Sequence, residues 1–507
     1  MTKKRNIVVF LCDQLRPDFL SAYGCKGVPT PNIDRLAREG MVFDRAITVS
    51  TVCAPSRASM MTGRYVSDHQ VWTNDVPFRD GMDYLAERMK RVGYRTGAFG
   101  KLHHYPAWDS KGFEVFAPME ENRLGEDSPY YQWLKKRRTD AEGDFNLDGL
   151  NFRYTEEEYY EHWIADRAIE FIREESGKPF LSWISFQGPH GPFDPPKELC
   201  GSCDGTLLPE VLRTRPDEKK PPVVRNRSAT VELPDGSDWR ELRLKYAEMI
   251  VAIDRQIGRV LQELVAGGLY ENTTIIFSSD HGDMLGDYGL NMKGPFPYRG
   301  QLDVPLIVAN DPAIRAGERT NALTGNLDIP GTCLHVAGDP QPIGFSRSLL
   351  DLARPEPEHP RSVNYHEFCD SVKTVEDERY RFCYYPFTND SQLFDLEKDP
   401  DESRNLAERP EYAEVCKRMM QHLLDFQILA KGVRIEAHDL VQEQQAGLDR
   451  KFPAWRQSLP ICFPLSAAER ERLQANELPC DINEFCRDET VLRSYAQPYW
   501  QESNFDK

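Results

Sequence analysis

Four short apolar segments of the chain end in the same way, at polar residues that can take part in chemistry. Continuous apolar runs of this length are typical of strands in a parallel sheet, where both faces are buried. The segments and the residues after them are 7–11 with Asp13 and Gln14, 96–100 with Lys101 and His103, 180–186 with Gln187 and His190, and 275–277 with Asp280 and His281. Because ligands bind beyond the carboxyl ends of such strands, the pattern predicts one shared site.

Amphipathic segments alternate with these strands. Apolar residues recur at three- and four-residue spacing, which is typical of helices, in segments 32–38, 84–91, 159–174 and 239–265. The longest of them is followed by Gly267 and Gly268, a common helix end. The alternation predicts an α/β fold class with a large, mainly parallel sheet flanked by helices.

The pattern changes after residue 360. Two strands are predicted at 380–385 and 392–396, with a turn at 388–390 and a helix at 411–429. We therefore expect a catalytic α/β domain at 1–360 and a smaller C-terminal α+β subdomain with an extended tail at 361–507. The tail is expected either to wrap the body or to reach a neighbouring subunit, which would make a homo-oligomer. Residues 197–237, rich in Pro, Gly and charge, are interpreted as an irregular insertion bordering the site.

Composition narrows the classes of partner. With 40% hydrophobic and 28% charged residues, the chain is expected to be soluble and globular. A formal net charge of −18 argues against nucleic-acid binding, and no apolar run reaches the length of a membrane span. The apolar run 7–11 is too short for a signal peptide, so the expected location is cytoplasmic, or periplasmic or secreted if a leader has been removed. The 12 cysteines lack a regular spacing, which favours reduced thiols over a disulfide framework.

Residues 52–64 are the most distinctive stretch. Pro55 suits the first position of a short helix and Gly63 suits its C-terminal cap. Cys53 would then lie at the positive end of the helix dipole, close to Arg57. Such a position is expected to lower the pKa of a thiol and to favour a bound oxyanion.

Cys53-Ala54-Pro55-Ser56-Arg57 resembles the C-x-P-S-R signature of the type I sulfatases, members of the alkaline phosphatase superfamily. Further family motifs occur in the family's order along the chain, at 6–13 and 29–36 before this signature and at 100–103, 189–192, 279–282, 293–294 and 393–406 after it. The resemblance implies a sulfuric ester hydrolase in which a separate formylglycine-generating enzyme oxidises Cys53. The hydrated aldehyde of formylglycine is the family's nucleophile.

The resemblance also implies one divalent cation. Its ligands would be Asp13, Gln14, Cys53 after conversion, Asp280 and His281. Oxygen ligands suit calcium, the cation we expect first. The family more often has an aspartate in place of Gln14 and an asparagine in place of His281. The set found here resembles the choline-sulfatase and phosphonate-monoester-hydrolase branches, and its lower charge and added nitrogen make manganese the alternative.

The remaining catalytic roles are likewise implied by the resemblance. Sulfate oxygens and the leaving group would be held by Lys101, Lys293 and His190. Asp280 is the family's candidate base, and Arg57 and His103 would steady the aldehyde hydrate.

Substrate identity is the least determined property. Candidate contacts, each equally well explained as a structural residue, are His69, Trp72, Asn74, His104, Tyr105 and Arg299. The expected partner is a small-molecule or saccharide sulfate ester, whether aryl, choline-like or glycan. Two alternatives stay open: a phosphonate monoester or phosphodiester hydrolase with the same site, and an unconverted scaffold that only binds sulfated glycans.

Overall fold

The computed structural model describes residues 4–79, 81–137, 155–174, 176–213, 219–231, 238–339, 341–358 and 360–429. One mixed sheet forms the centre of the molecule, with strand order β5-β4-β6-β1-β7-β8-β2-β9. The strands are β1 (Asn6–Cys12), β2 (Gly40–Phe43), β4 (Arg95–Gly100), β5 (Val115–Pro118), β6 (Phe180–Ser185), β7 (Thr273–Ser279), β8 (Leu306–Ala309) and β9 (Glu318–Thr320). The five strands from β5 to β7 are parallel, and β8 runs antiparallel to both neighbours.

The register of the parallel strands brings their carboxyl ends together. Leu11 of β1 is paired with Ser185 of β6, and Cys12 is paired with Ser279 of β7. In turn, Ser185 is paired with Gly100 of β4. The polar residues after these strands therefore meet at one sheet edge, as the apolar pattern predicted.

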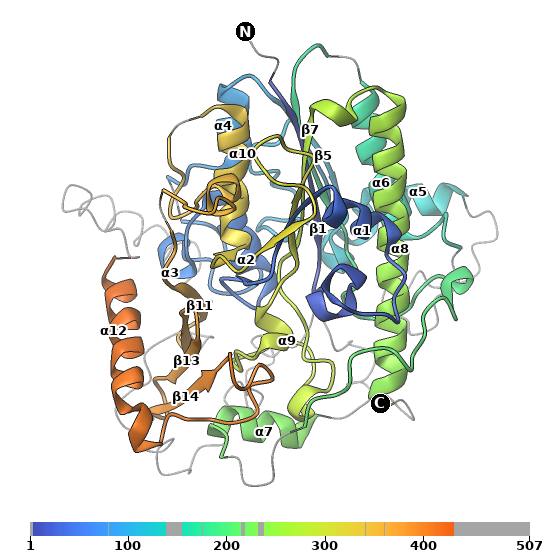
Figure 1. Ribbon diagram of the computed structural model, residues 1–507. Helices are drawn as coiled ribbons and strands as arrows, with labels where there is room; N and C mark the ends of the chain where they lie inside the picture. Colours follow the sequence, from blue (N-terminus) through green and yellow to red (C-terminus); the bar gives the residue numbers. More distant parts are fainter. Residues whose placement is uncertain are drawn as a thin grey trace.

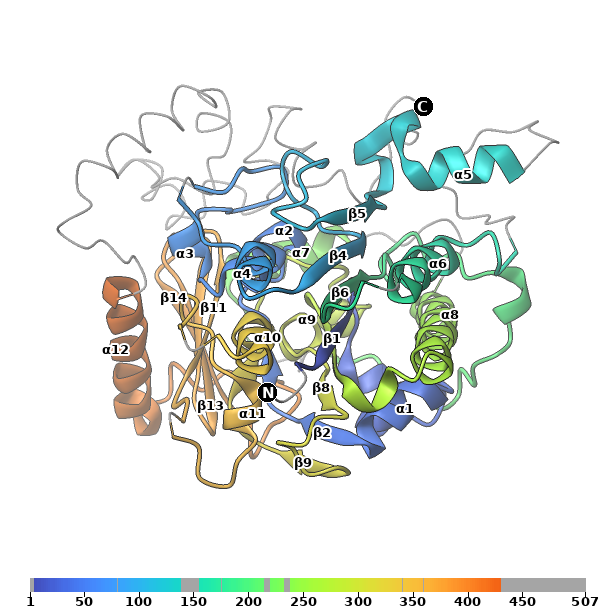
Figure 2. The same ribbon diagram turned by 90° about the horizontal axis from the view of Figure 1, so that it is seen from above.

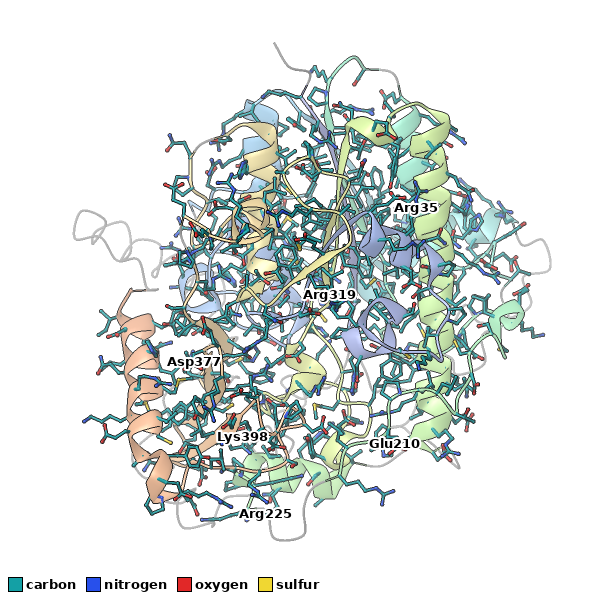
Figure 3. The ribbon with its side chains drawn as sticks, viewed as in Figure 1. Arg35, Glu210, Arg225, Arg319, Asp377 and Lys398 are labelled. Carbon is teal, nitrogen blue, oxygen red and sulfur yellow. The ribbon has the colours of Figure 1, made fainter. Side chains whose placement is uncertain are left out.

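Helices cover both faces of the sheet, and Figures 1 and 2 show the two layers on opposite sides of it. One layer contains α1 (Pro31–Arg38), α6 (Tyr160–Arg173) and α8 (Trp239–Ala266), and the other contains α2 (Cys53–Thr62), α4 (Leu85–Arg91), α10 (Ile329–Ala337) and α11 (Leu349–Leu352). Val8 and Phe10 of β1 pack in the first layer, whereas Val9 and Leu11 pack in the second. Side chains fill both spaces (Figure 3), which explains why β1 is apolar at every position from 7 to 12.

Most predicted elements are confirmed to within two residues. In α8, Asp238 caps the first turn by accepting a hydrogen bond from the Glu241 N–H, and the helix ends at Gly267. The interpretation of residues 197–237 as wholly irregular is wrong, because α7 (Pro222–Thr230) is a helix. It begins at a proline and buries Val224, but it lacks a clear apolar stripe, so periodicity did not reveal it.

A smaller antiparallel sheet forms the C-terminal part of the described chain. Its order is β11 (Asn364–Phe368), β12 (Val372–Glu376), β13 (Tyr380–Tyr385) and β14 (Asp390–Asp395). α12 (Ala413–Leu429) packs Met419 and Leu423 against Val375 and Phe382 of this sheet (Figure 1). The predicted fold class, an α/β body with a smaller α+β domain, is confirmed. The boundary at 360 stays a prediction, and the expected tail lies outside the described residues.

The described part of the chain also contains short strands and helices. They are β3 (Ala46–Ile47), which pairs with β10 (Thr324–Gly325), and the helices α3 (Val66–His69), α5 (Pro129–Arg137) and α9 (Arg299–Leu302). In the described part of the chain no helix combines the length and apolar character that a membrane crossing requires. The nine described cysteines are all free thiols.

Candidate active site

The sheet edge carries a compact group of potential metal ligands. Asp13 follows β1, Asp280 and His281 follow β7, and Cys53 begins α2. One ligand atom from each of these four residues lies within 4.8 Å of the others, and all four side chains are fully buried. The cluster joins segments more than 200 residues apart in the sequence.

α2 is buried along its whole length, including its one charged residue, Arg57. Cys53 is its first residue, and Gly63 ends it in the left-handed conformation with φ of 64°. The expectation that Pro55 is the first helical residue is wrong by two positions, although its missing N–H still falls within the first turn. Ser56 anchors the helix to the sheet edge, because its Oγ donates to the Asp280 carbonyl oxygen at 2.7 Å.

The Cys53 thiol lies among charged and polar groups. Its Sγ is 2.8 Å from Lys293 Nζ, 3.2 Å from His281 Nε2 and 3.8 Å from Asp13 Oδ1. Burial raises the pKa of Cys53 to about 11, and Asp13 adds to the rise against the opposing effect of Lys293. The expectation of a lowered thiol pKa is therefore wrong. Loss of water and a nearby carboxylate outweigh the helix dipole.

Three cations compensate the buried carboxylates. Lys101 Nζ lies 2.5 Å from Asp13 Oδ2, while Arg57 Nε donates to Asp280 Oδ2 at 2.8 Å and Nη2 is 3.4 Å from Asp13. Burial alone would raise the pKa of Asp13, but Lys101, Arg57 and Lys293 help to hold it well below its usual range. Arg57 also donates to the Lys101 carbonyl oxygen at 2.5 Å, which links α2 to the end of β4.

The donor chemistry of the cluster fits a divalent cation. Lys293 Nζ lies 2.9 Å from Gln14 Oε1 and 3.0 Å from His281 Nε2, so a positive charge already sits among these atoms. His281 directs Nδ1 at the Gly282 carbonyl oxygen at 2.9 Å, which makes Nδ1 the protonated nitrogen and Nε2 the available one. Burial lowers the pKa of His281 to about 4, which favours the neutral ring that a metal requires.

Gln14 adopts an uncommon backbone conformation beside this cluster. Its φ of 68° lies in the left-handed region, and its N–H donates to Asp280 Oδ1 at 2.9 Å. The hydroxyl of Tyr246, from α8, donates to the Gln14 carbonyl oxygen at 2.7 Å. These bonds hold a conformation that non-glycine residues rarely adopt, as is common where side chains must be aimed at a site.

His103 and His190 lie on the Lys101 side of the site. Both are buried, and His103 has a φ of 56°. Neither ring nitrogen of His103 has a hydrogen-bond partner among the described residues, whereas His190 Nδ1 lies 2.6 Å from the Gly191 carbonyl oxygen. Burial lowers the pKa of His190 to about 3.

Three of the six candidate substrate contacts differ in position: Asn74 lies next to Cys53, His104 is buried and Tyr105 is exposed. Asn74 Oδ1 accepts a hydrogen bond from the Ala54 N–H at 3.2 Å, next to Cys53. His104 is buried edge-on against Phe78 with a centroid distance of 5.1 Å, and neither of its ring nitrogens has a hydrogen-bond partner among the described residues. Tyr105 is 37% exposed.

The other three candidates make contacts within the chain. His69 Nε2 is 2.9 Å from Ser59 Oγ, and its Nδ1 accepts from the Val71 N–H. The Trp72 ring packs against the C-terminal sheet, with Lys373 5.7 Å from its centroid. Arg299 pairs with Asp401 at 3.1 Å. These contacts give each of the three a structural explanation.

Several residues at the site could not be predicted from the sequence. Glu121 forms an ion pair with Lys101 and accepts a hydrogen bond from Gln187 Nε2 at 2.6 Å. Asn326, which follows β10, donates to the Asp280 carbonyl oxygen at 2.9 Å. Neither lies in a recognisable motif, and only the fold brings them to the sheet edge. Asp283 was also missed, although it lies two residues after His281.

Comparison with known proteins identifies the family of this chain. The Sulfatase family model matches residues 5–339, and the model described as N-sulphoglucosamine sulphohydrolase, C-terminal, matches residues 286–428. The chain belongs to the sulfatase family of the alkaline phosphatase superfamily, and it is a sulfuric ester hydrolase. The resemblance seen in the sequence motifs is confirmed.

Three relatives show the breadth of the family around this chain. The arylsulfatase of Clostridium perfringens is 30% identical over 452 residues, covering 81% of this chain and 92% of the relative. The N-acetylglucosamine-6-O-sulfatase of Bacteroides thetaiotaomicron is 25% identical over 500 residues, covering 84% and 87%. The crystal structure of the phosphonate monoester hydrolase of Agrobacterium radiobacter is similar with a TM-score of 0.72 and 25% identity, covering 84% of this chain and 96% of that one.

Proposed function

We propose that this enzyme hydrolyses its sulfate ester with a formylglycine made from Cys53 and a divalent cation held by Asp13, Gln14, Asp280 and His281. The observation that carries the proposal is the buried cluster in which Asp13, Cys53, Asp280 and His281 bring their ligand atoms within 4.8 Å of one another. Two carboxylates, an amide oxygen and an imidazole suit calcium, our first choice, with manganese as the alternative.

The position of Cys53 supports its role as the precursor of the nucleophile. Its Sγ lies 2.8 Å from Lys293 Nζ, 3.2 Å from His281 Nε2 and 3.8 Å from Asp13 Oδ1, within the proposed metal cluster. Formylglycine, once made by a formylglycine-generating enzyme, would supply a hydrated aldehyde as nucleophile, and a cation held by this cluster would lower the pKa of its hydroxyl group.

The chain's own residues would position and neutralise the sulfate group. Lys293, 2.8 Å from Cys53 Sγ, and Lys101, 2.5 Å from Asp13, would bind sulfate oxygens as fixed positive charges in a buried site, where such charges act strongly. His190 keeps its Nδ1 proton on Gly191, so it contacts the leaving oxygen through Nε2. Negative charge from a bound sulfate favours a second proton at that atom. Asp280 holds the cation and is the candidate base.

Arg57 and His103 complete the proposed site. The guanidinium of Arg57 bonds to Asp280 and lies 3.4 Å from Asp13, so it keeps both carboxylates in place while the nucleophile forms. His103 is buried and neutral, since burial and neighbouring cations hold its pKa well below the usual range. Its ring is available to accept a proton from the aldehyde hydrate. Among the substrate candidates, Asn74 and His104 are our choices for contacts with the leaving group.

The direct test is the chemical state of residue 53. We expect mass spectrometry of the Cys53 peptide to show a converted fraction after co-expression with a formylglycine-generating enzyme, and aryl sulfatase activity to rise in proportion. Cys53→Ser should stay unconverted when the co-expressed enzyme accepts only cysteine, and it serves as the matched control. Full activity in protein with an unmodified thiol would refute the proposal, and absence of conversion even in the presence of the co-expressed enzyme would favour the unconverted scaffold that only binds sulfated glycans.

A second candidate activity is hydrolysis of phosphonate monoesters or phosphodiesters. The pairing of Gln14 with His281 at the site, together with the similarity to a phosphonate monoester hydrolase, supports it. A site with fewer negative ligands stabilises a more highly charged transition state relatively better. Parallel kinetics on aryl sulfate, phosphodiester and phosphonate esters distinguish the two, since the sulfatase proposal requires the highest kcat/KM for sulfate.

A further inference from the structure

Asp283 contacts Gln14, the one proposed metal ligand whose side chain could point either its oxygen or its NH₂ group at a cation. An amide side chain ends in an oxygen that can ligate a cation and an NH₂ group that cannot. Gln14 directs Nε2 at Asp283 Oδ2, 2.5 Å away, and Oε1 at the cation-binding side, where Lys293 Nζ lies 2.9 Å away. A carboxylate only accepts hydrogen bonds, so Asp283 selects the orientation that presents the oxygen.

The surroundings of Asp283 explain why this contact is well defined. The residue is 1% exposed, and its other oxygen, Oδ1, accepts a hydrogen bond from the Leu285 N–H at 2.8 Å. That bond belongs to the local turn and immobilises the carboxyl group. Oδ2 is not needed for the turn, and it is the atom that meets Gln14.

The contact also changes the charge balance of the site. The family more often has an aspartate where this chain has Gln14, and the sequence alone indicated the loss of one negative charge. Asp283 supplies a carboxylate immediately behind the amide, one hydrogen bond further from the cluster. The negative charge is therefore displaced outward, and the amide transmits it by polarisation of its N–H and C=O groups.

We propose that Asp283 is a positioning residue that turns the Gln14 oxygen toward the bound cation. Its carboxylate also supplies, one hydrogen bond further from the cation, the negative charge that an aspartate at position 14 would place next to the cation. The proposal rests on the metal site described under Proposed function. It predicts that positions 14 and 283 are coupled, because a carboxylate at both would place two like charges next to each other in a buried site.

The test measures cation binding in the unconverted protein, so the readout is independent of maturation and turnover. Manganese and calcium affinities are measured by calorimetry, with the manganese EPR spectrum as a second readout, for wild type, Asp283→Asn, Gln14→Asp and the double variant. Asp254→Asn is the matched control, because Asp254 is also a buried carboxylate but bonds to the N–H groups of Asn32 and Ile33. Circular dichroism checks that each variant is folded.

We expect Asp283→Asn to weaken cation binding about 10- to 100-fold, the usual effect of losing a partner behind a metal ligand. Gln14→Asp should also weaken it. The double variant should recover most of the loss, because the amide introduced at position 283 removes the like charge next to the carboxylate introduced at position 14. Asp254→Asn should bind as wild type does.

Equal affinity in wild type and Asp283→Asn, or additive losses in the double variant, would overturn the role of Asp283 and leave the metal site intact. No cation binding by wild type would instead overturn the metal site itself. If Asp283→Asn does not fold, the double variant decides: a folded double variant that binds the cation supports the coupling, and a folded one that does not bind refutes it.

Discussion

At the scale of single residues, the active site is a balance of buried charges. Asp13 and Asp280 are fully buried, and Arg57 contacts Asp280 at 2.8 Å while Lys101 contacts Asp13 at 2.5 Å. Removing one member of such a set leaves an uncompensated charge without water, which is more costly than removing a surface ion pair. Substitutions here therefore divide into those that change charge and those that do not.

Cys53→Ala belongs to the neutral class. We expect it to abolish turnover while the thermal unfolding midpoint and the bound cation change little, because Cys53 is a small uncharged side chain at a helix start. Turnover, calorimetric unfolding and metal content would be measured on the same preparation. Retention of about a tenth or more of wild-type activity would show that residue 53 does not provide the nucleophile.

Asp280→Ala belongs to the charged class. It removes the acceptor for Arg57 Nε and for the Gln14 N–H, along with a proposed metal ligand. We expect loss of activity that excess calcium does not restore, and a chelator should inactivate the wild type in a way that added calcium reverses. Turnover is assayed with metal content measured in parallel. Full wild-type activity after confirmed metal removal is the contrary result.

At the scale of elements, α2 and α3 are joined by a buried histidine. His69 ends α3 and bonds to Ser59 of α2, and burial lowers its pKa to about 3. The ordinary pKa of histidine is about 6.5, so between these values the unfolded chain binds a proton that the folded chain does not. The stability due to neutral His69 is complete above the unfolded pKa and is lost as the pH falls through this window.

His69→Gln should therefore flatten the dependence of stability on pH. We expect the free energy of unfolding of the variant to fall less steeply than that of the wild type below about pH 6.5, with a difference of up to about 1.4 kcal/mol per pH unit. Urea unfolding at about pH 7, 6 and 5 measures it. Parallel curves for the two proteins would contradict the assignment of this pH dependence to His69. His190 and His366, whose pKa values are also lowered, are present in both proteins and do not affect the difference between the curves.

At the scale of the whole molecule, a strongly acidic protein carries a site for an anion. The net charge of −18 repels polyanions beyond the reach of the local cations Lys101 and Lys293. Salt screens this repulsion, with a Debye length of about 10 Å at 0.1 M ionic strength. The effect should grow with the charge of the substrate.

We accordingly expect added salt to raise kcat/KM for a highly sulfated oligosaccharide relative to a monosulfated aryl ester. Measuring both substrates between low and physiological ionic strength gives the ratio, and a neutral osmolyte at equal osmolarity is the control. A ratio that falls with salt would mean that the local positive charge, not the overall charge, controls the approach of the substrate.

The sequence by itself determined the sheet, its helices and the chemistry at the strand ends. Apolar runs such as 7–11 and 275–277 can be buried on both faces only within a parallel sheet, and parallel strands align their carboxyl ends. Local spacing also placed α6 and α8 to within a residue. These features depend on the spacing of apolar residues over neighbouring positions of the sequence.

Only the tertiary structure decided the charge environment of the site. The pKa of Cys53 rises because segments distant in sequence bury it beside Asp13, an effect that a helix-dipole argument from local sequence could not include. Glu121 and Asn326 likewise reach the site through folding and without any motif. Desolvation and ion pairing depend on distances between residues that are far apart in the chain, and those distances exist only once the sheet has brought its strand ends together.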